Sequence, residues 1–370
     1  MKPRVVIAGL GDTGLLVALH LYPDFDVIGI TPKPCLVSGQ ELGTRLARPA
    51  AWREHFLMAF SRYRRLAGMQ VTQGSITRVD TDRQHVVVGS IDGGEHEVRY
   101  DVLVVASGAT NGFWRSAALE DIEAINGRID RDAGQVARAG SVAVLGGGAS
   151  GVSAASNLKE EYPSKDVHLF FSQAEPLPGY HPKVRRRVVA RLQKQGVVLH
   201  PDHRAVLPDG FDGDRLTSDP VEWVTGQAPF RADVTLWAVG RRRPSSGFLP
   251  RAMLDAEGYV KVDAHLRVPG FPNVFAVGDV AASDPNRSSA RNAGFLTVAH
   301  NVRCRVAGRD ASMKTFRATP YRWGSILGVQ RNGMRVFTPR GGSVLIRPWL
   351  VEHVLFPWIV RRMIYKGVRD

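Results

Sequence analysis

Residues 4–21 read RVVIAGLGDTGLLVALHL, and residues 141–158 read SVAVLGGGASGVSAASNL. Each stretch runs from an apolar segment through glycines spaced G-x-G-x-x-G into a helical pattern of apolar residues. This spacing permits a tight turn, lets backbone N–H groups approach a pyrophosphate, and packs a helix closely on a strand. One such loop is weakly diagnostic, but two in matching contexts predict two dinucleotide-binding units. Their glycines are Gly9, Gly11, Gly14, Gly146, Gly148 and Gly151.

A second apolar strand ending in glycine follows each loop. Residues 101–108 read DVLVVASG, and residues 232–240 read ADVTLWAVG. Nearly continuous apolar runs of this length are typical of parallel strands that are buried on both faces. The repeat therefore extends past the loops. We expect an α/β fold with two Rossmann-like domains and a C-terminal tail region.

Composition limits the classes of protein and site. The chain has 370 residues, of which 44% are hydrophobic and 23% charged, as in a soluble protein of two domains. Its two cysteines, Cys35 and Cys304, form no C-x-x-C dithiol and no thiolate metal site. We expect neither a metal nor a side chain that performs the catalysis. An apolar strand begins at Val5 without a signal-peptide pattern, which predicts a cytoplasmic protein, either free or at the cytoplasmic face of the membrane.

The net charge of +14 favours an anionic partner without choosing among nucleic acid, acidic lipid and phosphate-bearing cofactors. Short basic clusters occur at residues 185–187, 241–243 and 361–362. Such clusters are usually solvated faces, so charge is a weak argument for nucleic acid, which we regard as an unfavoured partner.

Two features depart from the dinucleotide-binding pattern. An Asp or Glu is expected to bind the ribose at the end of each unit's second strand, but Thr31 and Ser172 stand there instead. A hydroxyl can bond a ribose without repelling a 2'-phosphate, so both NADH and NADPH remain open. Asp12 lies inside the first glycine loop, where a carboxylate repels a pyrophosphate unless its side chain points away.

A third motif comes after the second unit. Residues 269–280 read PGFPNVFAVGDV, a strand that closes on Gly278-Asp279. Together with both glycine loops, with residues 106–108 and with residues 237–240, this motif resembles the FAD-dependent pyridine-nucleotide oxidoreductases. Among them the chain is most similar to type II NADH dehydrogenases and to apoptosis-inducing-factor-like quinone reductases. The resemblance covers residues 3 to about 305. It implies a glutathione-reductase-like fold with FAD in the first unit and NADH or NADPH in the second.

The resemblance also implies roles for individual residues. Asp279 would hydrogen-bond the ribityl chain of FAD, and a helix expected to begin near Ala290 would face the flavin ring with its positive end. Arg45 falls where the apoptosis-inducing-factor-like branch carries an arginine near the flavin. The FAD site would comprise Gly9, Gly11, Asp12, Thr13, Gly14, Thr31, Arg45, Ala106, Ser107, Gly108, Gly278, Asp279, Ala290 and Ala293. The nicotinamide nucleotide site would comprise Gly146, Gly148, Ala149, Ser150, Gly151, Ser172, Val239 and Gly240.

We expect the FAD domain to be discontinuous, with residues 1–112 and 255–310, around a nucleotide domain of residues 113–254. The C-terminal region, residues 311–370, ends in a segment with two tryptophans and several basic residues, too short and too charged to span a bilayer. Two alternatives stay open for residues 347–366. They lie flat in a membrane interface, or they pack on the protein or in a homodimer interface.

The implied reaction passes a hydride from NAD(P)H to the flavin and then two electrons to a quinone or another small acceptor. Two other hypotheses are kept. One is an NAD(P)H-dependent reductase of a ferredoxin or rubredoxin, whose acidic surface would suit the basic charge. The other is a redox-responsive flavoprotein that binds nucleic acid, for which salt-dependent DNA binding would be the sign.

Overall fold

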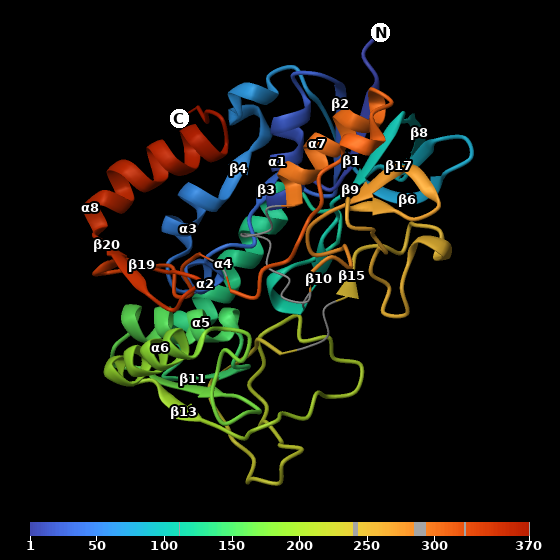
Figure 1. Cartoon of the computed structure of the whole chain (residues 1–370). Coiled ribbons are helices and arrows are strands. Elements are labelled where there is room, and N and C mark those ends of the chain that lie inside the picture. The colour runs from blue at the N-terminus through green and yellow to red at the C-terminus, as the bar shows by residue number, and fades with distance from the viewer. Residues whose placement is uncertain (111, 240–242, 285–293, 322, 370) are drawn as a thin grey trace.

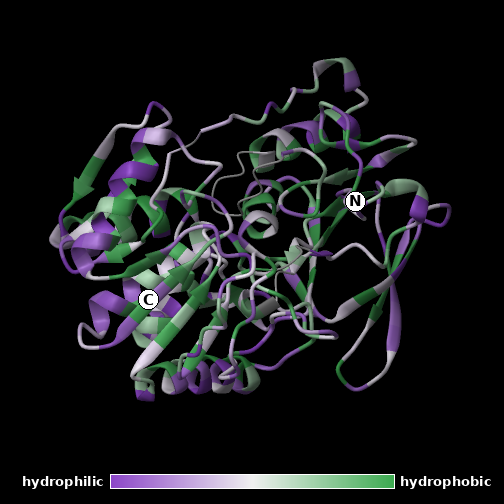
Figure 2. Cartoon of the chain, turned by 90° about the horizontal axis from the view of Figure 1, so that it is seen from below, coloured by the Kyte–Doolittle hydropathy of each residue, from purple (hydrophilic) through white to green (hydrophobic). Residues whose placement is uncertain are grey.

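The computed structural model describes residues 1–110, 112–239, 243–284, 294–321 and 323–369. Figure 1 shows two α/β units, one above the other, with the C-terminal helix along the outside of the upper unit. The strands of the two central sheets are apolar, and helices at the edge of the view in Figure 2 alternate apolar and polar colours along their length. The expected α/β class with two Rossmann-like units is confirmed.

The first unit is built on a six-stranded sheet in the order β16-β17-β9-β1-β2-β5, parallel except for β16. Its strands are β1 (Arg4–Ala8), β2 (Asp26–Thr31), β5 (Gln70–Gln73), β9 (Val102–Val105), β16 (Arg267–Val268) and β17 (Phe271–Ala276). Strand β1 lies between β2 and β9, and the order of the strands reverses at this point, which opens a crevice at their carboxyl ends. Helix α1 (Asp12–Leu21) begins at that crevice.

Strand β17 comes from a part of the chain that follows the whole second unit. It pairs with β9 in parallel, with Val274 opposite Leu103. This pairing carries the Gly278-Asp279 turn to the same carboxyl edge as the first glycine loop. Helix α7 (Gly294–Val306) then packs against α1 through apolar residues such as Val298 and Val302.

The second unit has a four-stranded parallel sheet in the order β13-β12-β11-β14. Its elements are β11 (Ser141–Leu145), α5 (Ala149–Glu161), β12 (Asp166–Phe170), α6 (Pro182–Gln195), β13 (Val198–His200) and β14 (Val234–Trp237). Here β11 lies between β12 and β14, so the second glycine loop also sits where the connections diverge.

Shorter elements complete the chain. Helices α2 (Leu42–Ala47), α3 (Pro49–Phe56) and α4 (Ile122–Arg138) lie between the units (Figure 1). An antiparallel sheet joins β6 (Ser75–Asp80), β7 (His85–Gly89) and β8 (Glu95–Arg99). Two-stranded pairs join β3 (Cys35–Val37) with β4 (Leu57–Ala59) and β10 (Ala109–Thr110) with β15 (Arg243–Pro244). Short 3-10 turns span Phe60–Arg62, Arg64–Leu66, Gly112–Trp114, Arg251–Met253 and Asp310–Ser312.

The two units touch closely where α2 crosses α5. A Cβ on Gly43 would lie 2.4 Å from the carbonyl oxygen of Ser153, so only glycine allows the two helices to approach this far. Beside the crossing, the amide of Asn157 donates to Leu327 O at 2.8 Å, and Arg48 Nη2 donates to Asn157 Oδ1 at 2.8 Å. A satisfied buried polar network of this kind favours one arrangement of its elements.

The C-terminal region forms an antiparallel sheet and a helix. Its elements are β18 (Val329–Gln330), β19 (Gly333–Phe337), β20 (Ser343–Ile346), α8 (Pro348–Leu350) and the π-helix η7 (Val351–Ile364). The ring of Phe356 stacks on His55 with centroids 3.8 Å apart, and Tyr365 meets the edge of Tyr63 at 5.4 Å. The tail therefore packs on the protein. Among the described helices, none is long and apolar enough to cross a bilayer.

Candidate cofactor pockets and the cavity between them

A pocket of about 430 Å³ opens at the carboxyl edge of the first sheet. Gly9 and Gly14 shape its floor. A Cβ on Gly14 would lie 1.9 Å from the carbonyl oxygen of Gly9, and Gly9 itself has a φ of 102°. Gly11 faces open space, where a ligand can approach the backbone. The second loop repeats this geometry, because a Cβ on Gly151 would lie 2.1 Å from the carbonyl oxygen of Gly146.

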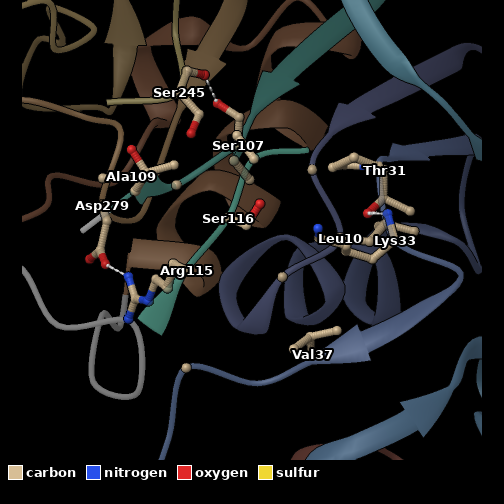
Figure 3. Close-up of a pocket in the computed structure, with 18 of the residues that line it drawn as sticks. Leu10, Thr31, Lys33, Val37, Ser107, Ala109, Arg115, Ser116, Ser245 and Asp279 are labelled. Atoms are coloured by element: carbon tan, nitrogen blue, oxygen red, sulfur yellow. Dashed lines mark hydrogen bonds and ion pairs between the residues drawn. The ribbon is translucent and has the colours of Figure 1, made fainter. Parts of the chain in front are cut away.

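The pocket has two chemically different ends, which Figure 3 shows on opposite sides. At one end Thr31 is buried, and its hydroxyl accepts a hydrogen bond from the backbone N–H of Lys33 at 3.3 Å. The ammonium of Lys33 donates to Glu120 and to the carbonyl of Ala118. Burial lowers the pKa of Lys33, while its contact with Glu120 opposes that shift. The Glu120 carboxylate and the Lys33 ammonium thus lie near Thr31, the residue at the end of β2.

At the other end lies Asp279, which is only 6% exposed. Arg115 Nη1 is 2.5 Å from Asp279 Oδ2 (Figure 3). Asp279 Oδ1 is buried and accepts no hydrogen bond within the described part of the chain. A buried acceptor without a donor is costly, and a ligand hydroxyl would satisfy it. The residues present therefore fit a polyhydroxylated chain such as the ribityl of FAD.

The Asp12 carboxylate is bound by donors from the segment that follows β3. Its Oδ1 accepts from the hydroxyl of Ser38 at 2.5 Å, and its Oδ2 accepts from the backbone N–H of Gly39 at 2.8 Å. A third donor, Gln40 Nε2, lies 3.4 Å from Oδ1. Both carboxylate oxygens are therefore directed at residues 38–40. Asp12 also stands in the first turn of α1, where negative charge is favourable.

Arg45 lies on α2 and lines the pocket, although an isolated arginine is exposed by default. Its Nη1 donates to the carbonyl of Trp114 at 3.0 Å, and its guanidinium carbon lies 5.2 Å from the centroid of that indole ring. Burial lowers the pKa of Arg45 to about 9, which leaves the side chain charged at neutral pH. It forms no salt bridge with a carboxylate in the described ranges.

A larger cavity of about 670 Å³ lies between the two units. One wall holds Gly148, Ala149 and Ser150 at the start of α5. Arg115 and Asp279 line this cavity and the first pocket, so the two spaces share a wall. The far wall is apolar and comes from the C-terminal region, with Trp323, Ile326, Met334, Val336, Phe337, Leu355, Phe356 and Val360.

Most residues predicted for the first site gather around its pocket. Those that line it are Gly9, Gly11, Asp12, Thr13, Thr31, Arg45, Ala106, Ser107, Gly108, Gly278 and Asp279, while Gly14 lies beneath. At the second site Val239 joins the start of α5 in the cavity wall, and Ser172 is exposed beyond it. Gly240, Ala290 and Ala293 lie outside the described residues.

Sequence reasoning missed several residues of these walls. Lys33 could have been found, because it follows the second strand by two residues, where a nucleotide's ribose is expected. Arg115, Glu41 and the C-terminal helix carried no such signal. Glu41 reaches the cavity because α2 packs there, Arg115 because the turn after β10 does, and the C-terminal helix because the tail folds back. No local sequence pattern encodes this packing.

The pyridine nucleotide-disulphide oxidoreductase family matches residues 3–300. An oxidoreductase, OXR1, from Ajellomyces capsulatus is 32% identical over 266 residues, which cover 65% of this chain and 54% of that protein. The type II NADH:quinone oxidoreductase Ndh of Mycobacterium tuberculosis is 27% identical over 342 residues, covering 79% of this chain and 71% of that enzyme. The chain thus spans about half the length of the first relative.

A solved structure of NDH2 from Plasmodium falciparum in complex with NADH has a TM-score of 0.74 at 13% identity and covers 99% of this chain and 97% of that one. At this identity the likeness shows the fold, which is the one expected. The resemblance drawn from the two glycine loops and the Gly278-Asp279 turn is therefore confirmed. Because the family match extends over most of its length, this chain belongs to the pyridine nucleotide-disulphide oxidoreductases and uses FAD and NAD(P)H as its cofactors.

Proposed function

We propose that the protein is an FAD-dependent NAD(P)H:quinone oxidoreductase. The observation that carries this proposal is the cavity between the two units. Its walls join the second glycine loop, the Asp279 end of the FAD pocket and an apolar surface from the C-terminal region. This one cavity can therefore admit a nicotinamide and an apolar acceptor beside the edge of a flavin.

FAD supplies the redox chemistry, accepting a hydride and returning electrons in pairs. The chain's own residues bind and orient it. Backbone N–H groups of Gly11 and Thr13 at the start of α1 would hold the pyrophosphate, as helix N-termini do. Asp279 would accept a ribityl hydroxyl through Oδ1, and Thr31 with Lys33 would meet the adenosine end.

The nicotinamide nucleotide would bind at the start of α5, where Gly148 and Ser150 face the cavity. Ser172 follows β12 at the expected ribose position and carries no charge. It neither repels a 2'-phosphate nor offers the two acceptors of a carboxylate. The site therefore supports both NADH and NADPH as donors.

The apolar wall of the cavity suits a quinone better than it suits a redox protein. The apolar wall formed by Phe337, Leu355 and Phe356 lies inside the cavity, where a flat apolar ring can enter. The specific observation that favours a ferredoxin-type acceptor is the net charge of +14, which would attract an acidic surface. Reduction of a short-chain quinone and of a ferredoxin in parallel assays separates the two hypotheses.

The test begins with an absorbance spectrum of the purified protein. Anaerobic titration with NADH, and separately with NADPH, should bleach the flavin band, and a short-chain ubiquinone analogue should restore it. Bleaching without reoxidation by any quinone would reject quinone as the acceptor. A protein that stays colourless after incubation with FAD would reject the whole proposal.

We also propose that the outer face of the tail docks on an anionic membrane. Exposed apolar residues cluster on β20 and on the C-terminal helix: Val344, Leu345, Trp349, Leu350, Val354, Trp358, Ile359, Met363 and Ile364. Arg362 lies over the ring of Trp358 at 4.7 Å, and Lys366 is exposed nearby. An apolar face with aromatic and basic residues at its margin is typical of helices in the membrane interface.

Co-sedimentation with vesicles tests this docking. Vesicles containing an anionic lipid should retain the protein, neutral vesicles should retain less, and the double variant Trp358→Ala with Met363→Ala should bind weakly. Val224→Ala, at an exposed apolar site in the other unit, is the matched control. A dimer that dissociates in the double variant, measured by light scattering without lipid, would assign the face to a homodimer instead.

A further inference from the structure

Glu41 stands at an unusual backbone position beside the cavity. It directly precedes α2 and has a φ of 47° and a ψ of 45°, a left-handed conformation that non-glycine residues seldom adopt. Strain of this kind persists where the surrounding structure demands a particular side-chain placement. Here that placement puts Glu41 in the wall of the cavity that contains the start of α5 and Asp279.

The two oxygens of the Glu41 carboxyl differ. Oε2 accepts from the backbone N–H of Val329 at 3.2 Å and from the hydroxyl of Thr44 at 3.3 Å. A Cβ on Gly328 would lie 2.8 Å from the same oxygen, so this side of the carboxyl is packed tightly. Oε1 accepts no hydrogen bond from the described residues. One oxygen is thus anchored, and the other remains available on a cavity-lining side chain.

Among the residues that the structure describes, no cation forms an ion pair with this carboxyl. Arg48, at the end of α2, is the basic group whose charge acts on it, and Arg48 is already engaged with Glu160 of α5 at 3.7 Å and with the carbonyl of Val329. The other charged or titratable groups that line the cavity are His55, Arg115, Tyr180, His181, Asp279, Tyr321 and Tyr365. Burial raises the pKa of Glu41, and the bonds from Val329 and Thr44 only partly oppose this. The raised pKa increases the fraction of this carboxyl that is protonated at a given pH.

The proposed reaction needs such a group. Reduction of a quinone to a hydroquinone takes two electrons and two protons. The hydride of NAD(P)H brings two electrons and one hydrogen nucleus, so one further proton must come from an acid. From this requirement and the geometry above we infer that Glu41 delivers that proton to the acceptor in the cavity. This inference rests on the proposed function.

The step balances as follows. FAD, held by the residues of the first pocket, would supply the quinone with the two electrons and one proton derived from NAD(P)H. The O–H bond of Glu41 breaks, and its proton goes to a quinone carbonyl oxygen, which becomes a hydroxyl. The carboxylate is reprotonated by a proton from the bulk solvent. The sum is NAD(P)H plus quinone plus one proton, giving NAD(P)⁺ plus hydroquinone.

The test uses Glu41→Gln in the FAD-loaded protein, because the amide can still accept the N–H of Val329. Stopped-flow measurements follow the two half-reactions separately. Bleaching by NAD(P)H should match the wild type. Reoxidation by the quinone should slow by about 10²-fold and lose its dependence on pH, since positioned acids contribute about 10² to 10⁴. Reoxidation by ferricyanide, which takes electrons without protons, should be unchanged.

A second measurement does not depend on turnover. Infrared difference spectra of wild type against Glu41→Gln at neutral pH should show the carbonyl band of a protonated carboxyl. Glu257→Gln, at an exposed site, is the control for both measurements. Unchanged quinone reoxidation with an unchanged pH profile would overturn the inference. Equal loss with quinone and ferricyanide would overturn it too, because it would assign Glu41 a structural role. A wild type that reduces ferricyanide but no quinone would instead overturn the proposed function.

Discussion

The hydroxyl of Ser38 lies 2.5 Å from Oδ1 of Asp12, so a residue inside the first glycine loop holds the segment that follows β3. Asp12→Ala removes the acceptor for Ser38 and Gly39 at once. Hydrogen bonds to a charged group contribute about 1.5–3 kcal/mol, so the segment should loosen and FAD should bind about 10-fold to 100-fold more weakly. Fluorescence titration of the deflavinated protein measures this. Ser38→Ala should have a smaller effect in the same direction, and tighter binding by Asp12→Asn would contradict the prediction.

The contact between Arg115 and Asp279 should stabilise the protein without its cofactor. Arg115→Ala leaves Asp279 buried without its counter-charge, which costs about 3 kcal/mol or more for a pair of this kind. Urea unfolding of the apoprotein measures the loss. Arg243→Ala is the control, because its contact with Asp212 at 2.7 Å is exposed and such pairs contribute about 1 kcal/mol or less. Equal effects in the two variants would refute the prediction.

The crossing of α2 and α5 should not tolerate a side chain at Gly43. Gly43→Ala places a Cβ 2.4 Å from a carbonyl oxygen, and forced overpacking costs about 1–3 kcal/mol. Thermal unfolding should show a lower midpoint. Gly127→Ala on α4 is the matched control, since a Cβ there meets nothing within 4 Å and alanine favours a helix by about 1 kcal/mol over glycine. The two substitutions should therefore shift the midpoint in opposite directions.

Acid should destabilise the second unit through His200. Burial lowers the pKa of His200 from 6.5 to about 4, and the positive charges of His168 and His203 add to this shift. Because the unfolded chain binds a proton near pH 6.5 and the folded chain does not, stability is complete above pH 6.5 and falls as the pH drops toward 4. Urea unfolding from pH 7 to pH 4 should show the decline. His200→Phe should flatten it, whereas exposed His96→Asn should leave it unchanged.

The parts of the fold that the sequence predicts are those determined by contacts within short segments of the chain. Gly9, Gly14 and their counterparts are required by contacts within one strand-turn-helix, so their spacing is visible in the chain itself. The resemblance places the Gly278-Asp279 turn at the first site, and the pairing of β17 with β9 gives the physical reason. Asp12 departs from the glycine-loop pattern, and the hydroxyl that binds its carboxylate belongs to Ser38, twenty-six residues away.

The parts that escaped prediction depend on contacts between distant segments. Arg115 meets Asp279 across 164 positions, and Val329 meets Glu41 across 288. No sequence spacing or local composition predicts either contact. The sequence allows two alternatives for the tail, because an apolar helix face with basic residues at its end can contact either a membrane or the rest of the protein. The stacking of Phe356 on His55 shows that one face of the tail packs on the protein.

The late position of β17 gives the protein an order of assembly on the ribosome. All four strands of the second sheet lie between residues 141 and 237, so that sheet can close while the first still lacks a member. Until residues 271–276 leave the exit tunnel, β9 remains an open edge and the Asp279 end of the first pocket does not exist. Translation can therefore complete the second sheet first, and a ligand can enter a finished first pocket only after most of the chain has been made.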